Sequence, residues 1–197
     1  MSDFSPVRRN IDAVAIGASA GGVEILSTLL SVLPATCPVS FFIVVHVPRE
    51  RPSLLPGIYA AKCALPVREA EDKEPIQSGT VYFAPPDYHL LVDRGPALAL
   101  SEDEPVHFSR PSIDVLFESA ADVYGERLLG LILTGANADG AAGLVAIGRA
   151  GGRTVVQDPK SAAASRLPEA ALAAAPVDYV LMPHDLRNLF ASWGTKE

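Results

Sequence analysis

Cysteine, basic charge and long apolar runs are all scarce in this chain, and each shortage excludes a class of protein. The 197 residues include two cysteines, Cys37 and Cys63, which stand too far apart for a Cys-x-x-Cys motif. Isolated thiols supply neither a disulfide framework nor a zinc site, so we expect two inert core thiols in a reducing compartment. The 16 Lys and Arg residues face 23 Asp and Glu residues, which gives a formal charge of -7. This balance lacks the basic surface of a nucleic-acid-binding protein.

The longest apolar run, near residues 39–47, falls well short of the roughly 18 residues that a membrane-spanning helix needs. We therefore expect no direct membrane insertion and a cytoplasmic location. With 49% hydrophobic residues, the chain is long enough to bury one core and too short for two ordinary domains. Residues 1–10 are polar and carry no periodic pattern, so they are interpreted as a flexible N-terminus before a single domain over residues 11–197.

Short apolar runs alternate with stretches of helical spacing along the chain. Runs typical of buried parallel strands occupy residues 11–16, 39–45, 80–84, 128–134, 154–157 and 179–182. Helical spacing occupies residues 23–33, 113–124, 141–150 and 168–175. Residues 88–92 and 97–100 flank a turn and predict a small antiparallel hairpin. The alternation predicts an α/β fold with a mostly parallel sheet and helices on both of its faces.

Ligands of parallel α/β sheets bind beyond the carboxyl ends of the strands, so the residues that follow each strand are the candidate site. Ser19 lies in a Gly-x-Ser-x-Gly motif over residues 17–21, directly after the first predicted strand. The motif matches a nucleophile elbow, in which a tight strand-to-helix turn exposes the Ser hydroxyl and nearby backbone N–H groups. It also fits a Gly-rich turn that holds a phosphate at a helix N-terminus, or a turn whose glycines serve packing alone.

His46 follows the second predicted strand, and Asp139 follows the fourth. His46 stands where a dinucleotide-binding fold carries an acidic residue for the ribose, which counts against a nicotinamide cofactor. Beside Ser19 its imidazole could activate the hydroxyl, whereas alone it would be a structural histidine. Asp139 is either the carboxylate that orients the imidazole or a cap of the following helix. Weaker candidates are Asp114, Asp158, His89, His107 and His184.

Longer motifs surround these residues and extend over nearly the whole chain. They are AIGASAGG at residues 15–22, VVHVP at 44–48, YFAPPDYH at 82–89, SRPSIDVLF at 109–117, LTGANADGAAG at 133–143, and QDP at 157–159 followed by LPEA at 167–170. In this order, they resemble the catalytic domain of the bacterial chemotaxis protein-glutamate methylesterases, the CheB type.

The resemblance implies that Ser19 is the nucleophile, His46 the general base and Asp139 the carboxylate that holds the imidazole. It also implies a doubly wound parallel sheet with an antiparallel addition, and a serine hydrolase that needs no metal or organic cofactor. The implied substrates are glutamyl methyl esters on the cytoplasmic helices of methyl-accepting chemoreceptors, often with deamidation of receptor glutamines. Backbone N–H groups at Ala20 and Ala136 are expected to hold the oxyanion.

The chain departs from the family pattern at two places. The family frequently has Thr where this chain has Ala20, and it usually has Met-Gly where this chain has Ala136 and Asn137. The N–H of Ala136 can still serve the oxyanion. The missing Thr hydroxyl bears on oxyanion support or on substrate shape.

Three interpretations of function from different classes stay open. The first is a serine hydrolase that acts on protein side-chain esters, and the second is a binding or adaptor module in which the triad survives only as structure. A phosphate or dinucleotide binder is the third. In the resembling family a receiver domain commonly precedes the catalytic domain, and because the first predicted strand begins near residue 11, we expect none in this chain.

Overall fold

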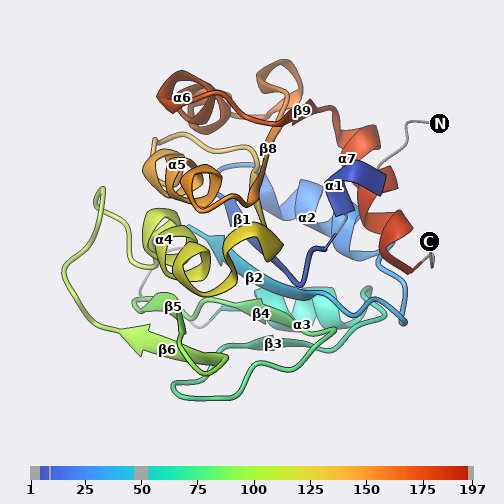
Figure 1. Ribbon diagram of the computed structural model, residues 1–197, viewed down its shortest axis with the longest axis vertical. Helices are drawn as coiled ribbons and strands as arrows, with labels where there is room; N and C mark the ends of the chain where they lie inside the picture. The colour runs from blue at the N-terminus through green and yellow to red at the C-terminus, as the bar shows by residue number, and fades with distance from the viewer. Residues whose placement is uncertain (1–4, 9, 47–52, 195–197) are drawn as a thin grey trace.

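The protein is known from a computed structural model, which describes residues 5–8, 10–46 and 53–194. Within these residues, seven parallel strands form one sheet in the order β3-β4-β2-β1-β7-β8-β9 (Figure 1). Their bounds are β1 Ala13–Ala18, β2 Ser40–Val45, β3 Val67–Glu69, β4 Val81–Phe83, β7 Leu128–Ile132, β8 Arg153–Gln157 and β9 Tyr179–Leu181. The three central strands are buried along their whole length, which explains their continuous apolar sequences.

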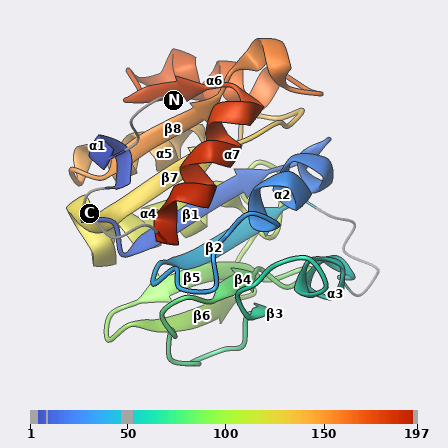
Figure 2. The ribbon, with the colours of Figure 1, turned by 90° about the vertical axis from the view of Figure 1, so that its right-hand side faces the viewer.

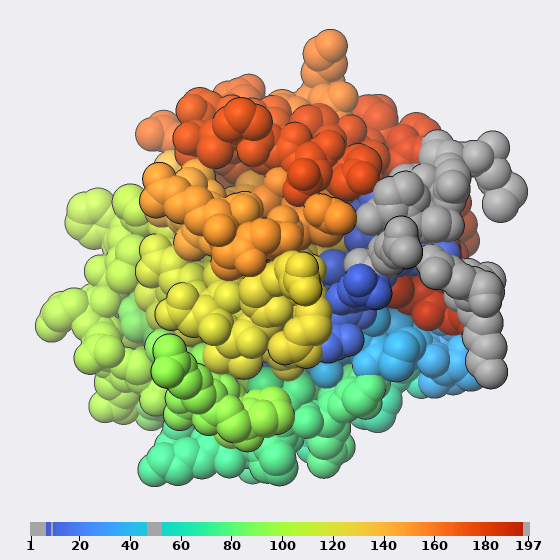
Figure 3. Space-filling view, in the orientation of Figure 1, coloured from blue at the N-terminus to red at the C-terminus, as the bar shows by residue number. Residues whose placement is uncertain are grey.

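Helices cover both faces of this sheet (Figures 1 and 2). One face carries α4 Ile113–Tyr124, α5 Ala141–Arg149 and α6 Arg166–Ala174. The other face carries α1 Ser5–Arg8, α2 Gly22–Leu30, α3 Leu55–Ala60 and α7 Pro183–Ala191. Short 3-10 helices occupy η1 Gly125–Arg127, η2 Pro159–Ser161 and η3 Ser192–Gly194. In the space-filling view, α4, α5 and α6 form adjacent bands of one continuous surface (Figure 3).

Alternation along the strands divides the core into two layers. In β1, Val14 and Ile16 belong to the layer under α2 and α7, whereas Ala13 and Ala15 belong to the layer under α4 and α5. The small alanines let α4 lie close to the sheet at its centre. None of the helices among the described residues has the length and apolar character to cross a membrane.

An antiparallel hairpin, β5 His89–Asp93 and β6 Ala97–Ser101, packs beside α4. The N–H of Val92 donates to Ser119 Oγ of α4 over 3.1 Å, and Leu90 and Leu98 are buried in the same layer. The prediction of a doubly wound, mostly parallel sheet with helices on both faces and a small hairpin is therefore confirmed.

Part of the N-terminal segment forms a short helix. Ser5–Arg8 form α1, in which Val7 is 1% exposed and belongs to the core. An Arg8 guanidinium nitrogen donates to the carbonyl oxygen of Ser192 over 2.7 Å, so this helix is tied to the far end of the chain. One apolar side chain and one long-range bond thus connect this short helix to the rest of the domain. Residues 1–4 and 9 of the predicted N-terminus lie outside the described part.

The connections reverse direction between β1 and β7. From β1 the chain winds outward through β2 and β4, and from β7 it winds the other way through β8 and β9. The reversal therefore falls between the loops that follow β1 and β7 at the carboxyl edge, which is where ligands bind in such sheets.

Candidate active site

Ser19 lies at this carboxyl edge, in the turn between β1 and α2. Its N–H donates to the carbonyl oxygen of Thr134 over 2.9 Å, and its own carbonyl accepts from the N–H of Gly22 over 2.8 Å. The left-handed residue of the turn is Gly21, with a φ of 79°, where a Cβ atom would lie 2.6 Å from Ala163 Cβ. Gly21 thus makes the sharp turn, and Ser19 keeps ordinary backbone geometry beside the loop that follows β7.

His46 and Asp139 are brought together by neighbouring loops. His46 follows β2, and its N–H donates to the carbonyl oxygen of Ala18 over 3.2 Å, which sets it beside the end of β1. Its Nε2 lies 2.8 Å from Asp139 Oδ2, with the imidazole 13% exposed and the carboxylate fully buried. Residues 93 positions apart in the chain therefore form the charged and aromatic part of one site.

The amino end of α4 surrounds the Asp139 carboxylate. Oδ1 accepts from Ser112 Oγ over 2.7 Å and from the N–H of Asp114 over 3.2 Å, and Oδ2 also accepts from the N–H of Ile113 over 2.7 Å. Burial alone would raise the pKa of this carboxyl, but the hydrogen bonds from His46, Ser112 and the two backbone N–H groups outweigh burial and lower it. The carboxylate is therefore ionised at neutral pH and holds a proton on Nε2 of His46.

This arrangement bears on one of the two sequence-based interpretations of Asp139, the helix cap. The cap of α5 is Gly140, which has a φ of 111°, so Asp139 does not cap the helix that follows it. It binds instead to the start of α4, which precedes it in the chain. Ser112 caps α4 with the same hydroxyl, because Ser112 Oγ also accepts from the N–H of Val115 over 3.4 Å.

The second imidazole nitrogen of His46 also has a partner. Asn137 Nδ2 lies 3.1 Å from Nδ1, and Asn137 Oδ1 is buried without a hydrogen-bond partner among the described residues. Over the same part of the chain, the Ser19 hydroxyl makes no hydrogen bond, to His46 or to any other group. Ser19, His46 and Asp139 thus share one edge of the sheet, with Asn137 on the imidazole nitrogen that Asp139 leaves open.

The two backbone N–H groups expected at the oxyanion have no internal acceptor. Within the described residues, neither Ala20 nor Ala136 donates its N–H to a protein group, and both residues are exposed. Their loops are joined through Thr134, whose hydroxyl donates to the carbonyl oxygen of Ala20 over 2.8 Å. Both N–H groups are therefore free to bind an external acceptor.

The weaker candidates lie outside the His46 cluster. Buried His89 accepts from the N–H of Ser112 through Nδ1 over 3.1 Å and so supports the start of α4. His107 Nε2 lies 3.4 Å from Asp114 Oδ2, and burial raises the pKa of Asp114. Asp158 caps η2, and His184 lies beside its neighbour Asp185. Among the described residues, none of these side chains forms a hydrogen bond or an ion pair with His46.

The two cysteines are free thiols, as predicted. Burial raises the pKa of Cys37 to about 11, and it also raises the pKa of the half-buried Cys63. Both thiols are therefore protonated at neutral pH, which leaves Ser19 as the candidate nucleophile.

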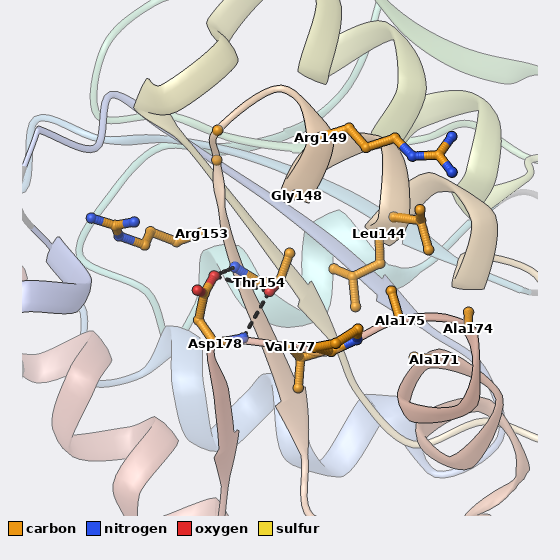
Figure 4. Close-up of a pocket in the computed structure, with 14 residues that line it drawn as sticks. Leu144, Gly148, Arg149, Arg153, Thr154, Ala171, Ala174, Ala175, Val177 and Asp178 are labelled. Atoms are coloured by element: carbon orange, nitrogen blue, oxygen red, sulfur yellow. Dashed lines mark hydrogen bonds between the residues drawn. The ribbon is translucent and has the colours of Figure 1, made fainter.

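A cavity of about 490 Å³ lies at the opposite edge of the sheet (Figure 4). Arg153 begins β8, and Asp178 precedes β9, so this cavity faces the amino ends of the strands. Figure 4 shows the side chains of Arg149 and Arg153 extending in opposite directions, while Asp178 is bonded to Thr154. The polar groups drawn there pair with one another or point outward, in contrast to the cluster around His46.

Comparison with known proteins identifies the family of this fold. The family model described as CheB methylesterase matches residues 14–190, from β1 to α7. The chain belongs to the CheB methylesterase family. The match includes Ser19, His46, Ser112 and Asp139, and it confirms the family resemblance and the expectation of an esterase.

Relatives in this CheB methylesterase family differ in length. A Leptospira interrogans protein is 46% identical over 92% of this chain and 94% of its own length, and its name provisionally assigns it as a protein-glutamate methylesterase/protein-glutamine glutaminase. The Bordetella parapertussis protein with that assignment is 40% identical over 92% of this chain, but the chain spans only 53% of it. The crystal structure of the Thermotoga maritima CheB methylesterase catalytic domain matches with a TM-score of 0.87, at 28% identity, over 92% of this chain and 98% of that one.

The CheB-type motifs also enclose contacts that sequence reasoning missed. Ser112 is recognisable as a helix cap in the SRPSIDVLF segment, but its bond to Asp139 joins two distant motifs. Asn137 is recognisable only as a departure from the family pattern, and its contact with His46 depends on how the loop after β7 folds. Val47 and Pro48 of the second motif lie outside the described residues.

Proposed function

We propose that the protein removes methyl groups from glutamyl methyl esters on the cytoplasmic helices of chemoreceptors, with Ser19 as nucleophile, His46 as general base and Asp139 as the orienting carboxylate. The observation that carries the proposal is the 2.8 Å bond between His46 and an ionised, buried Asp139 at the edge where Ser19 follows β1. The methylesterase names of the relatives support the substrate class.

The first half of the reaction forms an acyl-enzyme. Ser19 Oγ bonds to the glutamyl carbonyl carbon while Nδ1 of His46 takes the hydroxyl proton, because Nε2 already carries the proton that Asp139 holds. The imidazolium then gives this proton to the departing methoxide, and methanol leaves. The buried carboxylate stabilises the transient positive charge on His46.

Backbone N–H groups would hold the negative oxygen of each tetrahedral intermediate. Ala20 and Ala136 are exposed residues in the loops that follow β1 and β7, and their N–H groups have no internal acceptor among the described residues. A preorganised donor of this kind is worth about 10²- to 10³-fold in kcat in other acyl-transfer enzymes. Because these donors belong to the backbone, the Ala side chains at both positions do not remove them.

Water completes the reaction. His46 takes a proton from water as the hydroxide bonds to the acyl carbon, and the bond to Ser19 Oγ breaks as that oxygen regains a proton from His46. The products are glutamate and free enzyme. The same sequence of steps hydrolyses a glutamine side chain if ammonia replaces methanol as the leaving group, which fits the glutaminase part of the relatives' names.

The direct test is methanol release from a methylated receptor cytoplasmic fragment, measured beside ammonia release from its unmethylated, glutamine-containing form. We expect wild type to release methanol and Ser19→Ala to release none. We also expect small free methyl esters to react far more slowly than the fragment. Equal efficiency on small esters would indicate a general esterase, and full activity of Ser19→Ala would reject the proposed mechanism.

A further inference from the structure

Asn137 is a polar side chain in the centre of the site that the proposed reaction does not use. Its Nδ2 lies 3.1 Å from Nδ1 of His46, the nitrogen on which the proposed reaction depends. Its Oδ1 is buried and has no hydrogen-bond partner among the described residues. The contact with His46 is therefore the only hydrogen bond of this amide within that part of the chain.

The protonation of the site fixes the direction of this hydrogen bond. The Asp139 carboxylate is ionised and accepts only, so Nε2 of His46 carries the ring proton. Nδ1 of the neutral ring then has a lone pair and no hydrogen. Asn137 must accordingly present its NH₂ group to Nδ1, and its oxygen must point away, as observed.

A neutral imidazole nitrogen accepts one hydrogen bond, through a single lone pair in the plane of the ring. The Ser19 hydroxyl needs the same lone pair in order to lose its proton to His46. Asn137 and Ser19 therefore cannot both donate to Nδ1. The described structure shows the first of these two states, because Asn137 is bonded to Nδ1 and the Ser19 hydroxyl is bonded to no described group.

The unpaired Oδ1 makes the Asn137 state easy to leave. A buried carbonyl oxygen without a donor has lost its hydrogen bonds to water and gained nothing in return. Movement of the amide away from His46 sacrifices one neutral hydrogen bond and restores water to the oxygen. Displacement of the amide would therefore cost little and would leave Nδ1 of His46 open to the Ser19 hydroxyl.

We propose that Asn137 is a positioning residue that competes with Ser19 for Nδ1 of His46, and so holds the nucleophile inactive until the amide moves aside. The inference rests on the proposed function, because it takes Ser19 and His46 as the catalytic pair. On this proposal, Asn137, which departs from the Met-Gly pattern of the family, lowers the reactivity of Ser19 in the resting protein.

The test is the rate at which a fluorophosphonate probe labels Ser19 in the full chain. In this reaction Ser19 Oγ bonds to phosphorus, fluoride leaves, and His46 takes the hydroxyl proton, so the rate reports on activation of Ser19 without a receptor substrate. The variants are Asn137→Ala and Asn137→Ser, which lack the amide, and Asn137→Asp, which keeps its shape. Asn188→Ala, an exposed Asn of α7, is the matched control.

We expect Asn137→Ala and Asn137→Ser to label several-fold faster than wild type, and Asn188→Ala to label at the wild-type rate. Asn137→Asp should label more slowly than wild type, because a carboxylate has no N–H to donate and stabilises a protonated imidazole that cannot accept the Ser19 proton. A purely structural role would slow both the truncated and the isosteric variants. Urea unfolding identifies any variant that is unfolded.

Three results would overturn the competition. Slower labelling of folded Asn137→Ala and Asn137→Ser would show that the amide supports His46. Unchanged labelling of all three Asn137 variants would show that the contact has no effect on Ser19. If wild type, Asn137→Ala and Ser19→Ala all fail to label while folded, the Ser19 mechanism fails, and the inference fails with it.

Discussion

Asp139 and Asp178 lie at opposite edges of the same sheet, and each is held by hydrogen bonds from a hydroxyl and from the backbone. Asp178 is exposed, and its Oδ2 accepts from the N–H and hydroxyl of Thr154, which in return accepts from the N–H of Asp178. That set of bonds is closed and joins the starts of β8 and β9. Asp139 is fully buried, and one of its bonds leads to the His46 imidazole, which is 13% exposed. Hydrogen bonds between Asp178 and Thr154 alone stabilise structure. The hydrogen bond between Asp139 and the imidazole of His46 can also support proton transfer.

The largest predicted effect concerns Ser19 and His46. Ser19→Ala and His46→Ala should each lower kcat by roughly 10⁴- to 10⁶-fold, because the two side chains act as one unit. The double variant should be no slower than the slower single variant. Methanol release from a methylated receptor fragment measures all three, and a much slower double variant would show that the two residues act independently.

Replacement of the two aspartates sharpens the comparison between the edges. Asp139→Asn should lower kcat by about 10²- to 10⁴-fold, because the amide no longer holds the required proton on Nε2 of His46. Asp178→Asn, the same chemical change at the other edge, should leave kcat unchanged. Near-normal turnover of Asp139→Asn would assign the orienting role to another carboxylate.

Loss of the Ser112 hydroxyl should affect both function and stability. Ser112→Ala removes a donor from Asp139 and the cap of α4, which should cost about 1–2 kcal/mol of unfolding free energy. We also expect kcat to fall about 10-fold, because the carboxylate keeps its backbone donors but loses one of its anchors. Urea unfolding and methanol release check the two effects separately, and an unchanged midpoint would contradict the capping role.

At the amino edge of the sheet, a substitution should lower stability and leave turnover unchanged. Thr154→Val keeps the shape of a buried side chain but breaks its hydroxyl bonds with Asp178, which should cost about 1 kcal/mol in urea unfolding. Turnover per folded molecule should equal that of wild type. A loss of turnover at full occupancy of the folded state would show that the cavity of Figure 4 communicates with the active site.

The smallest effect concerns the pH dependence of stability. Folding lowers the pKa of Asp139, so the ionised carboxylate stabilises the folded state at pH values above its unfolded pKa of about 4. This contribution is lost as the pH falls through the lower, folded pKa. Asp139→Asn should therefore lose less stability than wild type between pH 5 and the acid limit of folding. Urea unfolding at each pH measures the free energy of unfolding of the two proteins. Equal losses of this free energy toward low pH would contradict the lowered pKa of Asp139.

The main architecture was predictable from sequence because the buried strands are continuous apolar runs with helical spacing between them. Besides α1 and the short 3-10 helices, the sequence analysis did not predict β3, α3 and α7, and each has an identifiable reason. β3 Val67–Glu69 is a three-residue edge strand with no apolar run, and α3 Leu55–Ala60 contains Pro56 and Gly57, which predict a turn. In α7, Pro183 at the first position and the spacing of Leu186, Leu189 and Phe190 are a helix signal that was available in the sequence.

The site was predictable to the extent that it follows strand ends. Ser19 and His46 directly follow neighbouring strands, and parallel strands bring such residues to one edge. Asp139 lies seven residues beyond β7, so the conformation of a loop determines its hydrogen-bond partner. The sequence therefore could not distinguish a cap of α5 from a hydrogen-bond acceptor for His46. The contact of Asn137 with Nδ1 depends on the same loop and follows from no local pattern.

The measurement that tests the account most directly is methanol release from a methylated receptor cytoplasmic fragment by wild type, Ser19→Ala and Asp178→Asn under identical conditions. We predict release by wild type and by Asp178→Asn at equal rates per folded molecule, and none by Ser19→Ala. Release by Ser19→Ala at the wild-type rate would contradict the assignment of catalysis to the carboxyl edge of the sheet.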